Sequence, residues 1–399
     1  MRNIIITGGG LTNKGAQAMT FIAVYELKKR YPHHRIYVLS EEDKQRSDNE
    51  KNIYLFDFIG WYPQKFAKCQ GNPVLKLLCT LVHRKEYSEF LKIYKNCDLM
   101  IDISGYAFGS NWGRSINTAY LDNFEFAKAL NIPLYIMPQT FGPFDFNGKY
   151  GYEIVERAKS LFSYAKVVCA REKESFDLLT NKLNLNNVIL SNDLVLCYKS
   201  IDVLSVYKKK PIFYCPEICA QSVGIIPNNR NSSVGGDEKS KALYKDCINI
   251  CLSRGYTIYI LSHSSVDFEL CQELKREFSD NRNVILLENE FSCLEFNDIV
   301  GKFSFLIASR FHSIVHAYKN HVPCVVLGWA EKYRELLSLF GQGQFMFDIR
   351  DNINSEDLNN VIDHMINSTG NEKEKLARIL TKVQENNIFD ILPATLEKK

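Results

Sequence analysis

Several features that mark other protein classes are missing from this sequence. No apolar run approaches the roughly 18 residues of a membrane-spanning helix. The net charge is only +3, which gives no support for general nucleic-acid binding, so any anion site must be local. The twelve cysteines include no Cys-x-x-Cys pair. We therefore expect buried, reduced thiols rather than a disulfide framework or a zinc site.

Nucleotide-binding fingerprints and targeting segments are also absent. Thr7-Gly-Gly-Gly10 follows the first apolar run, but neither the spacing G-x-G-x-x-G nor the P-loop sequence Gly-Lys-Ser/Thr occurs. The apolar run itself, Ile4–Ile6, is too short for a signal peptide. No internal repeat or low-complexity tract is present. These absences lead us to expect a cytoplasmic protein.

The order of apolar runs predicts an α/β fold with two domains. A chain of 399 residues exceeds one ordinary core. Short β-rich runs alternate with helical patterns in both halves, which is typical of parallel sheets covered by helices. We expect strands at Asn3–Thr7, Arg35–Leu39, Leu99–Ile103, Leu134–Met137, Lys166–Ala170, Ser222–Ile226, Thr257–Leu261, Val284–Leu287, Phe305–Ala308 and Cys324–Leu327.

The same pattern suggests where the domains end. We expect an N-terminal Rossmann-like domain at residues 1–205 and a C-terminal one at 206–350, joined through Tyr198–Lys210. Residues 351–399 are predicted to form two amphipathic helices, from Ser355 onward, that could pack back on the N-terminal domain. Asp57–Tyr94 is less regular and is predicted to be helical insertions. Two Rossmann-like domains facing a cleft form the GT-B architecture, in which ligands collect at the carboxyl ends of strands.

A cation and an imidazole stand at one of these strand ends. Arg310 and His312 follow the run Phe305–Ala308, and Ser309 opens the next helix. Such a junction favours anions, and a His can transfer protons near neutral pH. A lone His is more often a core residue, but the adjacent Arg favours catalysis on a small anionic donor. His316, one turn further on, could form a metal pair with His312, although no acidic third ligand is evident.

Three other strand ends in the N-terminal half carry polar side chains. Arg171 can bind a carboxylate or phosphate with its planar fork, or it can simply pair with Glu172. Asp102 could bind a sugar hydroxyl or act as a base, or it could form an Asx-turn or helix cap. Gln139 suits hydrogen bonding to a polyol, or a structural turn.

Two weaker candidates follow other predicted strands. The glycine-rich turn after the first strand leads to Asn13, which could contact an acceptor or only close a tight βα turn. His263, with Asp267 nearby, follows Thr257–Leu261 and offers a companion site in the second domain. Both lie at positions where ligands of α/β proteins collect.

Taken in order, these motifs resemble those of the polysaccharide pyruvyl transferase family. The match runs from residue 1 to about 330. Its elements are Asn13-x-Gly15-x-x-Ala18, Asp102-Ile-Ser-Gly105, Gln139-x-x-Gly142-Pro143, Val168-x-Ala-Arg171-Glu172-x-x-Ser175, Asn192-Asp193-Leu194 and Ser309-Arg310-Phe311-His312-Ser313. Members of this family have a GT-B-like fold. They transfer the enolpyruvyl carbons of phosphoenolpyruvate to two hydroxyls of one sugar, which leaves a cyclic ketal.

The resemblance implies phosphoenolpyruvate as co-substrate, with neither cofactor nor metal, and a glycan as acceptor. His312 would donate the proton, and Asp102 would complete the catalytic pair. The donor, on the C-terminal side, would be bound by Arg171, Arg310, Phe311, Ser309 and His263. The acceptor, on the N-terminal side, would be bound by Asn13, Tyr106 and Gln139.

One motif departs from the family pattern. Many members carry an acidic residue in the first loop, as Asn-x-Gly-Asp-x-Ala, where this chain has Ala16 and Gln17. If that acid is the base for the acceptor hydroxyl, Asp102 must replace it here, or the acceptor differs.

Two other functions remain open from the sequence. A glycosyltransferase of the same fold would use a nucleotide sugar, with Glu288 or Glu290 as a ribose contact. A non-catalytic member of a capsule assembly complex would bind only an acceptor or a partner. If the acceptor is lipid-linked, the protein would work at the inner face of the membrane. The aromatic and basic segment Trp61–Lys68 could then make peripheral contact, or it could be a loop packed on its own domain.

Overall fold

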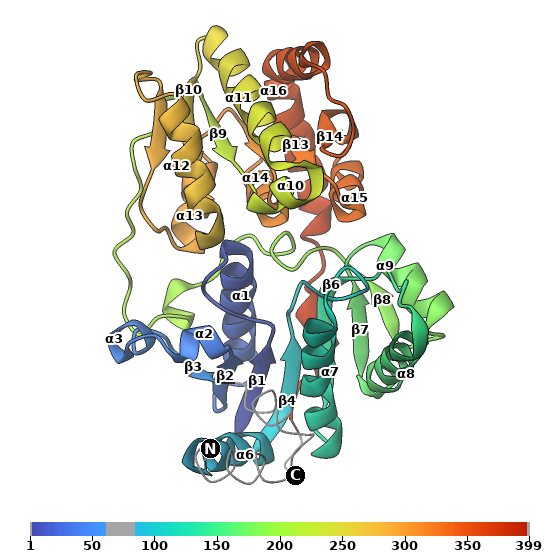
Figure 1. Ribbon diagram of the computed structural model, residues 1–399. Helices are drawn as coiled ribbons and strands as arrows, with labels where there is room; N and C mark the ends of the chain where they lie inside the picture. Colours follow the sequence, from blue (N-terminus) through green and yellow to red (C-terminus); the bar gives the residue numbers. More distant parts are fainter. Residues whose placement is uncertain (1, 61–83, 397–399) are drawn as a thin grey trace.

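Two sheets, one in each half of the chain, organise the molecule (Figure 1). The computed structural model describes residues 2–60 and 84–396. Every pair of neighbouring strands in both sheets is parallel. The predicted α/β class is therefore confirmed.

The first sheet has the strand order β3-β2-β1-β4-β6-β7-β8, and β5 pairs with β6. Its strands are β1 (Asn3–Thr7), β2 (Arg35–Leu39), β3 (Asp57–Ile59), β4 (Cys97–Asp102), β5 (Tyr106–Phe108), β6 (Leu134–Phe141), β7 (Val167–Ala170) and β8 (Val188–Leu190). Ile4 and Ile6 enter one hydrophobic core, and Ile5 enters another on the opposite face. Burial on both faces explains why the strand is a continuous apolar run.

The second sheet has the order β11-β10-β9-β12-β13-β14. Its strands are β9 (Ser222–Ile226), β10 (Thr257–Leu261), β11 (Val284–Leu287), β12 (Phe305–Ala308), β13 (Cys324–Gly328) and β14 (Met346–Asp348). The reversal of strand order between β9 and β12 creates the crevice in which doubly wound sheets bind ligands.

Helices cover both sheets (Figure 1). Those of the first half are α1 (Lys14–Arg30), α2 (Glu41–Lys44), α3 (Asp48–Lys51), α6 (Arg84–Lys95), α7 (Arg114–Ala129), α8 (Gly148–Tyr164) and α9 (Lys173–Asp177). Those of the second half are α10 (Asn229–Gly235), α11 (Asp237–Ser253), α12 (Phe268–Glu277), α13 (Cys293–Val300), α14 (Phe311–Lys319), α15 (Glu331–Leu339) and α16 (Ser355–Val383).

The prediction of two helices in the tail is wrong, because α16 is one continuous helix of 29 residues. Gly370 lies in its interior, where a glycine costs only about 1 kcal/mol relative to alanine. Buried side chains on both sides of this glycine, including Ile362, Met365, Leu376 and Leu380, hold the helix together.

Asp57–Tyr94 was predicted to form helical insertions, and only part of what the structure describes there is helical. It begins with β3, which pairs with β2, and its last described part belongs to α6. The three residues of β3 are too few to show an alternating pattern. The expectation of buried thiols is wrong for Cys215 and Cys219, which are exposed, whereas Cys247 and Cys251 are buried on α11.

Residues near the start and near the end of the sequence make contacts between the two halves of the chain. Near the start, Asn13 bridges to Ser264, and the backbone N–H of Cys293 donates to Oε1 of Gln17 (2.6 Å). Near the end, the chain crosses from α16 back to the first domain (Figure 1), where Tyr198 donates to Oδ1 of Asn387 (2.7 Å). These contacts hold the strand ends of the two sheets close together.

Across residues 2–60 and 84–396, no helix has both the length and the apolar character that crossing a membrane requires. The aromatic and basic segment Trp61–Lys68 lies outside the described residues.

Candidate active site

A cavity of about 220 Å³ lies between the two domains. Its walls come from segments that directly follow β1, β4, β7, β9, β10, β12 and β13, so the carboxyl ends of both sheets meet there. The predicted residues that line it are Asn13, Tyr106, Arg171, His263, Arg310, Phe311 and His312. A slightly larger cavity, of about 250 Å³, lies at the edge of the first sheet and holds none of them.

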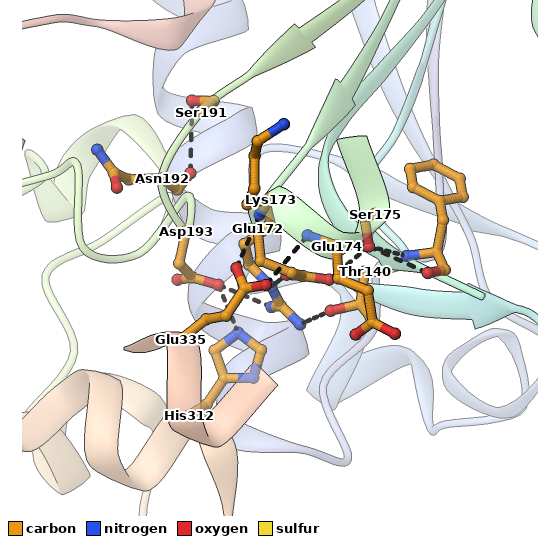
Figure 2. Close-up of polar contacts among 12 residues, drawn as sticks. Thr140, Glu172, Lys173, Glu174, Ser175, Ser191, Asn192, Asp193, His312 and Glu335 are labelled. Atoms are coloured by element: carbon orange, nitrogen blue, oxygen red, sulfur yellow. Dashed lines mark hydrogen bonds and ion pairs between the residues drawn. The ribbon is translucent and has the colours of Figure 1, made fainter. Parts of the chain in front are cut away.

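At the centre of the site, His312 of the second domain faces Asp193 of the first (Figure 2). Nε2 of His312 lies 3.5 Å from Oδ2 of Asp193, close enough for an ion pair but without a hydrogen bond. The same oxygen accepts a hydrogen bond from Nη1 of Arg171 (2.9 Å). Burial alone would raise the pKa of Asp193, but the nearby His312 and Arg171 outweigh it and lower that pKa.

Arg171 is held on three sides. Besides Asp193, it donates from Nη2 to Oγ1 of Thr140 (2.6 Å), and its Nε lies 3.4 Å from Oε2 of Glu172. Its guanidinium carbon lies 4.1 Å from the centre of the Phe311 ring, which belongs to the other domain. The predicted pairing with Glu172 therefore exists, but it is the weakest of these contacts. Arg171 is a fixed cation whose stacking joins the two domains.

The start of α14 supplies the opposite wall of the cavity. Arg310 is its N-cap residue, and no side chain caps the helix there. The Arg310 guanidinium makes a bidentate pair with the fully buried Asp267, with Nε 2.8 Å from Oδ2. An uncapped helix start beside a fixed guanidinium is suited to an anionic group.

Asn13 and Gly15 bring α1 against His312. Oδ1 of Asn13 accepts from the backbone N–H of Gly15 (2.8 Å), so Asn13 caps α1. A Cβ atom placed on Gly15 would lie 2.3 Å from Nδ1 of His312. Only a glycine allows this approach. The predicted tight turn and the predicted contact with the site are thus both present at one loop.

Asp102, the predicted base, lies behind the cavity wall. It is fully buried. Each of its two carboxylate oxygens accepts two hydrogen bonds, all from neutral groups. Those donors are Thr7 (2.8 Å), Ser104 (2.7 Å), Gln139 (2.7 Å) and Tyr120 (3.2 Å). Burial raises the pKa of Asp102, and these hydrogen bonds oppose the rise. Its catalytic role stays a prediction, and the geometry favours a positioning role.

Gln139 and Ser309 are also behind the wall. Gln139 is fully buried, and its side-chain amide donates a hydrogen bond to Asp102, so it does not reach the cavity in this arrangement. Ser309 is fully buried, with its Oγ accepting from Tyr244 (2.7 Å) and its carbonyl accepting from Tyr333 (3.0 Å). Both residues shape the walls that other side chains line.

Tyr106 and His263 do reach the cavity. The Tyr106 hydroxyl donates to the carbonyl of Gly142 (2.9 Å), which fixes its ring at the wall. His263 is buried, and neither of its ring nitrogens has a hydrogen-bond partner. Burial, with the neighbouring His316 and His312, holds the pKa of His263 well below its ordinary value, so it meets the cavity as a neutral imidazole.

Four charged residues of the site were not among the predicted catalytic and binding residues. Asp193 and Asp267 hold Arg171 and Arg310. From the sequence, Asp193 was only part of the motif Asn192-Asp193-Leu194, and Asp267 was only named beside His263 in the weaker companion site. Lys332 lines the cavity with its Nζ over the rings of Tyr106, Phe311 and Tyr333. Arg230 stacks on Trp112 across the cleft, 5.3 Å from the ring centre. No local pattern marks Lys332, because two of its three ring partners, Tyr106 and Phe311, are far away in sequence.

The predicted alternative of a metal pair at His312 and His316 finds little support in the geometry. His316 is directed to Asn297, with Nδ1 3.2 Å from Oδ1, and its ring lies against Phe296. Within the described parts of the chain, no cluster of three His, Cys, Asp or Glu side chains is arranged to hold a metal ion.

Comparison with known proteins agrees with the motifs. The model of the polysaccharide pyruvyl transferase family matches residues 13–331. No curated protein matches the sequence.

Solved structures share the fold at low sequence identity. UDP-GlcNAc 2-epimerase from Methanocaldococcus jannaschii, in complex with UDP-GlcNAc and UDP, is 14% identical with a TM-score of 0.56, over 96% of this chain and 100% of that one. UGT71G1 from Medicago truncatula, complexed with UDP-glucose, is 11% identical with a TM-score of 0.54, over 98% and 95%. A glycosyltransferase from Rickettsia africae is 12% identical with a TM-score of 0.54, over 97% and 99%.

These structural likenesses establish the fold alone, and that fold is GT-B-like, as predicted. The family match spans most of both domains and includes every residue that lines the cavity except Lys332 and Tyr333. The chain therefore belongs to the polysaccharide pyruvyl transferase family and is a transferase.

Proposed function

We propose that this protein transfers a pyruvyl group from phosphoenolpyruvate to two hydroxyls of one sugar in a surface or capsular polysaccharide precursor. The products are a cyclic ketal and phosphate. One observation carries the proposal: His312 and Arg171 line the cavity between the domains, and buried Asp193 contacts both of them. Family membership supports pyruvyl transfer, and the cations around the cavity support an anionic donor.

The donor carries two anionic groups, a carboxylate and a phosphate. Arg171 and Arg310 offer one planar fork from each domain, and the start of α14 adds an uncapped helix terminus. Charge-assisted contacts of this kind suit both anionic groups. These contacts can hold both anionic groups by hydrogen bonds, so the proposal includes no metal and no cofactor.

The reaction begins with a proton. In our proposal His312 protonates the methylene carbon of phosphoenolpyruvate, which makes the adjacent C2 electrophilic. One sugar hydroxyl attacks C2, the bond from C2 to the phosphate oxygen breaks, and the second hydroxyl closes the ketal ring. Of the two hydroxyl protons, one replaces the proton that His312 gave up, and the other leaves with the phosphate. Asp193 and Gly15 hold the imidazole in place for this step.

The acceptor would enter along the wall formed by Asn13, Tyr106 and Asn111, all of which line the cavity. Ser104 also lines the cavity, and its hydroxyl donates a hydrogen bond to Asp102. Asp102 supports the wall through this contact. In this arrangement Asp102 positions the wall, and the departing phosphate takes the acceptor's proton. A glycan linked to a lipid would satisfy the same contacts as a free one.

The donor is tested by ligand-dependent thermal stabilisation. Phosphoenolpyruvate at a hundred times its dissociation constant should add about 2.7 kcal/mol to the free energy of unfolding, which raises the melting temperature measurably. A panel of nucleotide sugars serves as the comparison. Stabilisation by a nucleotide sugar alone would contradict the proposal and favour the glycosyltransferase. Glu288 and Glu290, its predicted ribose contacts, are exposed and do not line the cavity.

Chemistry is tested with the variant His312→Ala. Ketal formation and phosphate release should be lost, while the circular dichroism spectrum and melting temperature remain close to those of the wild type. Full activity in the variant would remove His312 from the mechanism. A wild-type protein that neither binds phosphoenolpyruvate nor releases phosphate would be the non-catalytic partner instead.

A further inference from the structure

Another cavity, of about 210 Å³, lies where the two domains meet the segment that joins them. Phe21 and Ile22 of α1 line it from the first domain, and Leu294 of α13 lines it from the second. Val203 and Phe213 of the joining segment complete the apolar lining. The path of this segment can be followed from β8 to β9 in Figure 1, and it packs against α1. The cavity shares no lining residue with the active-site cavity, so it is a separate site.

The size and the walls of this cavity suit a small apolar group. An apolar cavity of about 150 Å³ can take up benzene, so this one has room for an apolar body of about eight carbon atoms. Such a body gains free energy when it leaves water. Because both domains contribute walls, a ligand here would bind only to the arrangement of the domains seen in this structure.

One cation of the cavity has no partner. Lys319, in the last turn of α14, lines the cavity and is half-buried. Among the residues that the structure describes, its ammonium makes neither an ion pair nor a hydrogen bond. Burial lowers the pKa of Lys319 to about 8, and Cys293 and Asp193 oppose the fall, so the side chain is mostly charged at pH 7. The other charged groups of the cavity, Lys199 and Asp298, are exposed and offset each other.

Asn297 of α13 adds a hydrogen-bond donor to the same cavity. Its Oδ1 accepts from Nδ2 of Asn320 (3.0 Å) and lies 3.2 Å from Nδ1 of His316, which fixes the orientation of the side-chain amide. Its Nδ2 donates to none of the described residues. An ammonium and an amide N–H, both without an acceptor, therefore line one apolar cavity.

We propose that this cavity binds a small carboxylic acid with an apolar body, whose carboxylate contacts Lys319 and Asn297. A carboxylate would give the ammonium a charge-assisted hydrogen bond, and its second oxygen can accept from the amide. A neutral ligand would leave the ammonium unpaired, and an anion without an apolar body would leave the walls in contact with water. The inference goes beyond the proposed function, because this site lies apart from the active site and takes no part in the reaction.

Calorimetric titration of the full-length protein at pH 7 tests the inference, with octanoate as the probe. 1-Octanol has the same apolar body without a charge, and acetate has the charge without the body. Octanoate should bind at least about tenfold more tightly than 1-octanol, because it alone pairs with the ammonium. It should bind at least about a hundredfold more tightly than acetate, because it alone fills the cavity. No binding of octanoate, or binding no tighter than that of either reference compound, overturns the inference.

The variant Lys319→Met tests the charged contact. Octanoate should bind about ten- to a hundredfold more weakly to this variant, and 1-octanol within about twofold of its wild-type affinity. Lys28→Met is the matched control. Lys28 is a half-buried lysine of α1 whose pKa is also lowered by burial, but it does not line the cavity. Unchanged octanoate binding in Lys319→Met, or an equal loss in Lys28→Met, overturns the inference.

A filled cavity tests where the apolar body lies. Val203→Trp places an indole in the cavity and should weaken both octanoate and 1-octanol at least about tenfold. Leu204→Trp should change neither, because Leu204 is 54% exposed and does not line the cavity. The melting temperature and circular dichroism spectrum of each variant check its fold. Octanoate binding that persists in folded Val203→Trp takes place elsewhere and overturns the inference. None of these measurements involves phosphoenolpyruvate, so their outcome is independent of the proposed function.

Discussion

Asp102 and Asp193 are both buried carboxylates of the first domain, yet their surroundings are opposite. Asp102 accepts hydrogen bonds from four neutral groups, and burial raises its pKa. Asp193 faces Arg171 and His312, which outweigh burial and lower its pKa. Burial alone therefore does not mark a functional carboxylate. The charge of its partners decides whether it supports a wall or orients reactive groups.

The largest effect is expected from Asp193→Asn. The change removes the counter-charge of buried Arg171 and the partner of His312. Breaking a buried ion pair costs about 3–5 kcal/mol of unfolding free energy. Misplacing the proton donor should lower kcat/KM for ketal formation by about 10²–10⁴-fold. Steady-state kinetics and urea unfolding measure the two losses.

A surface pair provides the control for that variant. Asp57 pairs with Arg35 at the surface, and its side chain is 44% exposed. Asp57→Asn should change the unfolding free energy by less than about 1 kcal/mol and leave kcat/KM unaltered. If Asp57→Asn lost as much unfolding free energy and kcat/KM as Asp193→Asn, the contacts of Asp193 with Arg171 and His312 would have no special importance.

The next effect comes from Gly15→Ala, which alters no charge. The new Cβ would lie 2.3 Å from Nδ1 of His312, so the imidazole must move away from its present position beside Asp193. A displacement of about 1 Å at a reacting group can cost about 100-fold in rate, and we expect a loss of that size in kcat. Gly113→Ala is the control, because a Cβ there has no neighbour within 4 Å. Normal kinetics in Gly15→Ala would show that the position of His312 is unimportant.

A smaller effect is expected from Asp102→Asn. The hydroxyls of Thr7 and Ser104 can rotate to accept from the new amide, while the remaining oxygen keeps the bonds from Gln139 and Tyr120. Activity should fall less than about tenfold, since only a wall support changes. A loss of about 100-fold or more in kcat, in a variant that still folds, would restore Asp102 as the base.

The smallest effect is in the pH dependence of stability. The folded-state pKa of Asp193 is lowered. Its ionised form therefore stabilises the fold fully above the unfolded pKa of about 4, and this stabilisation is lost as the pH falls through the folded-state pKa. The folded-state pKa of Asp102 is raised, so its ionisation opposes folding as the pH rises above about 4. From pH 3.5 to 7.5, the stability deficit of Asp193→Asn should grow and that of Asp102→Asn should shrink. If the stability deficits of both variants changed with pH in the same way, the opposite pKa shifts of Asp193 and Asp102 would be wrong.

The regular parts of the fold follow from local patterns. β1, β2, β9, β10, β11 and β12 have the predicted bounds, because each is a short, mostly apolar run, and all but the edge strand β11 lie inside a sheet. β3, β5, β8 and β14 were missed, since three residues at a sheet edge carry too little pattern. Their existence depends on the neighbouring strand rather than on their own sequence.

The site was only partly predictable for the same reason. His312, Arg310 and Arg171 stand at strand ends, which is a local signal. Asp102 gives the same signal and yet points into the first domain, because its neighbours Thr7 and Gln139 come from the adjacent strands β1 and β6. The contact of Asp193 with His312 joins two domains, and no spacing along the chain encodes it.

The central claim is that Asp193 and His312 act as one unit across the domain interface. A double-mutant cycle on kcat/KM for ketal formation tests it directly, with Asp193→Asn, His312→Gln and the combination of both. If the two residues act together, the double variant should be about as active as the worse single variant. If the losses of the two single variants multiply in the double variant, the residues act independently, and this account of the site is wrong.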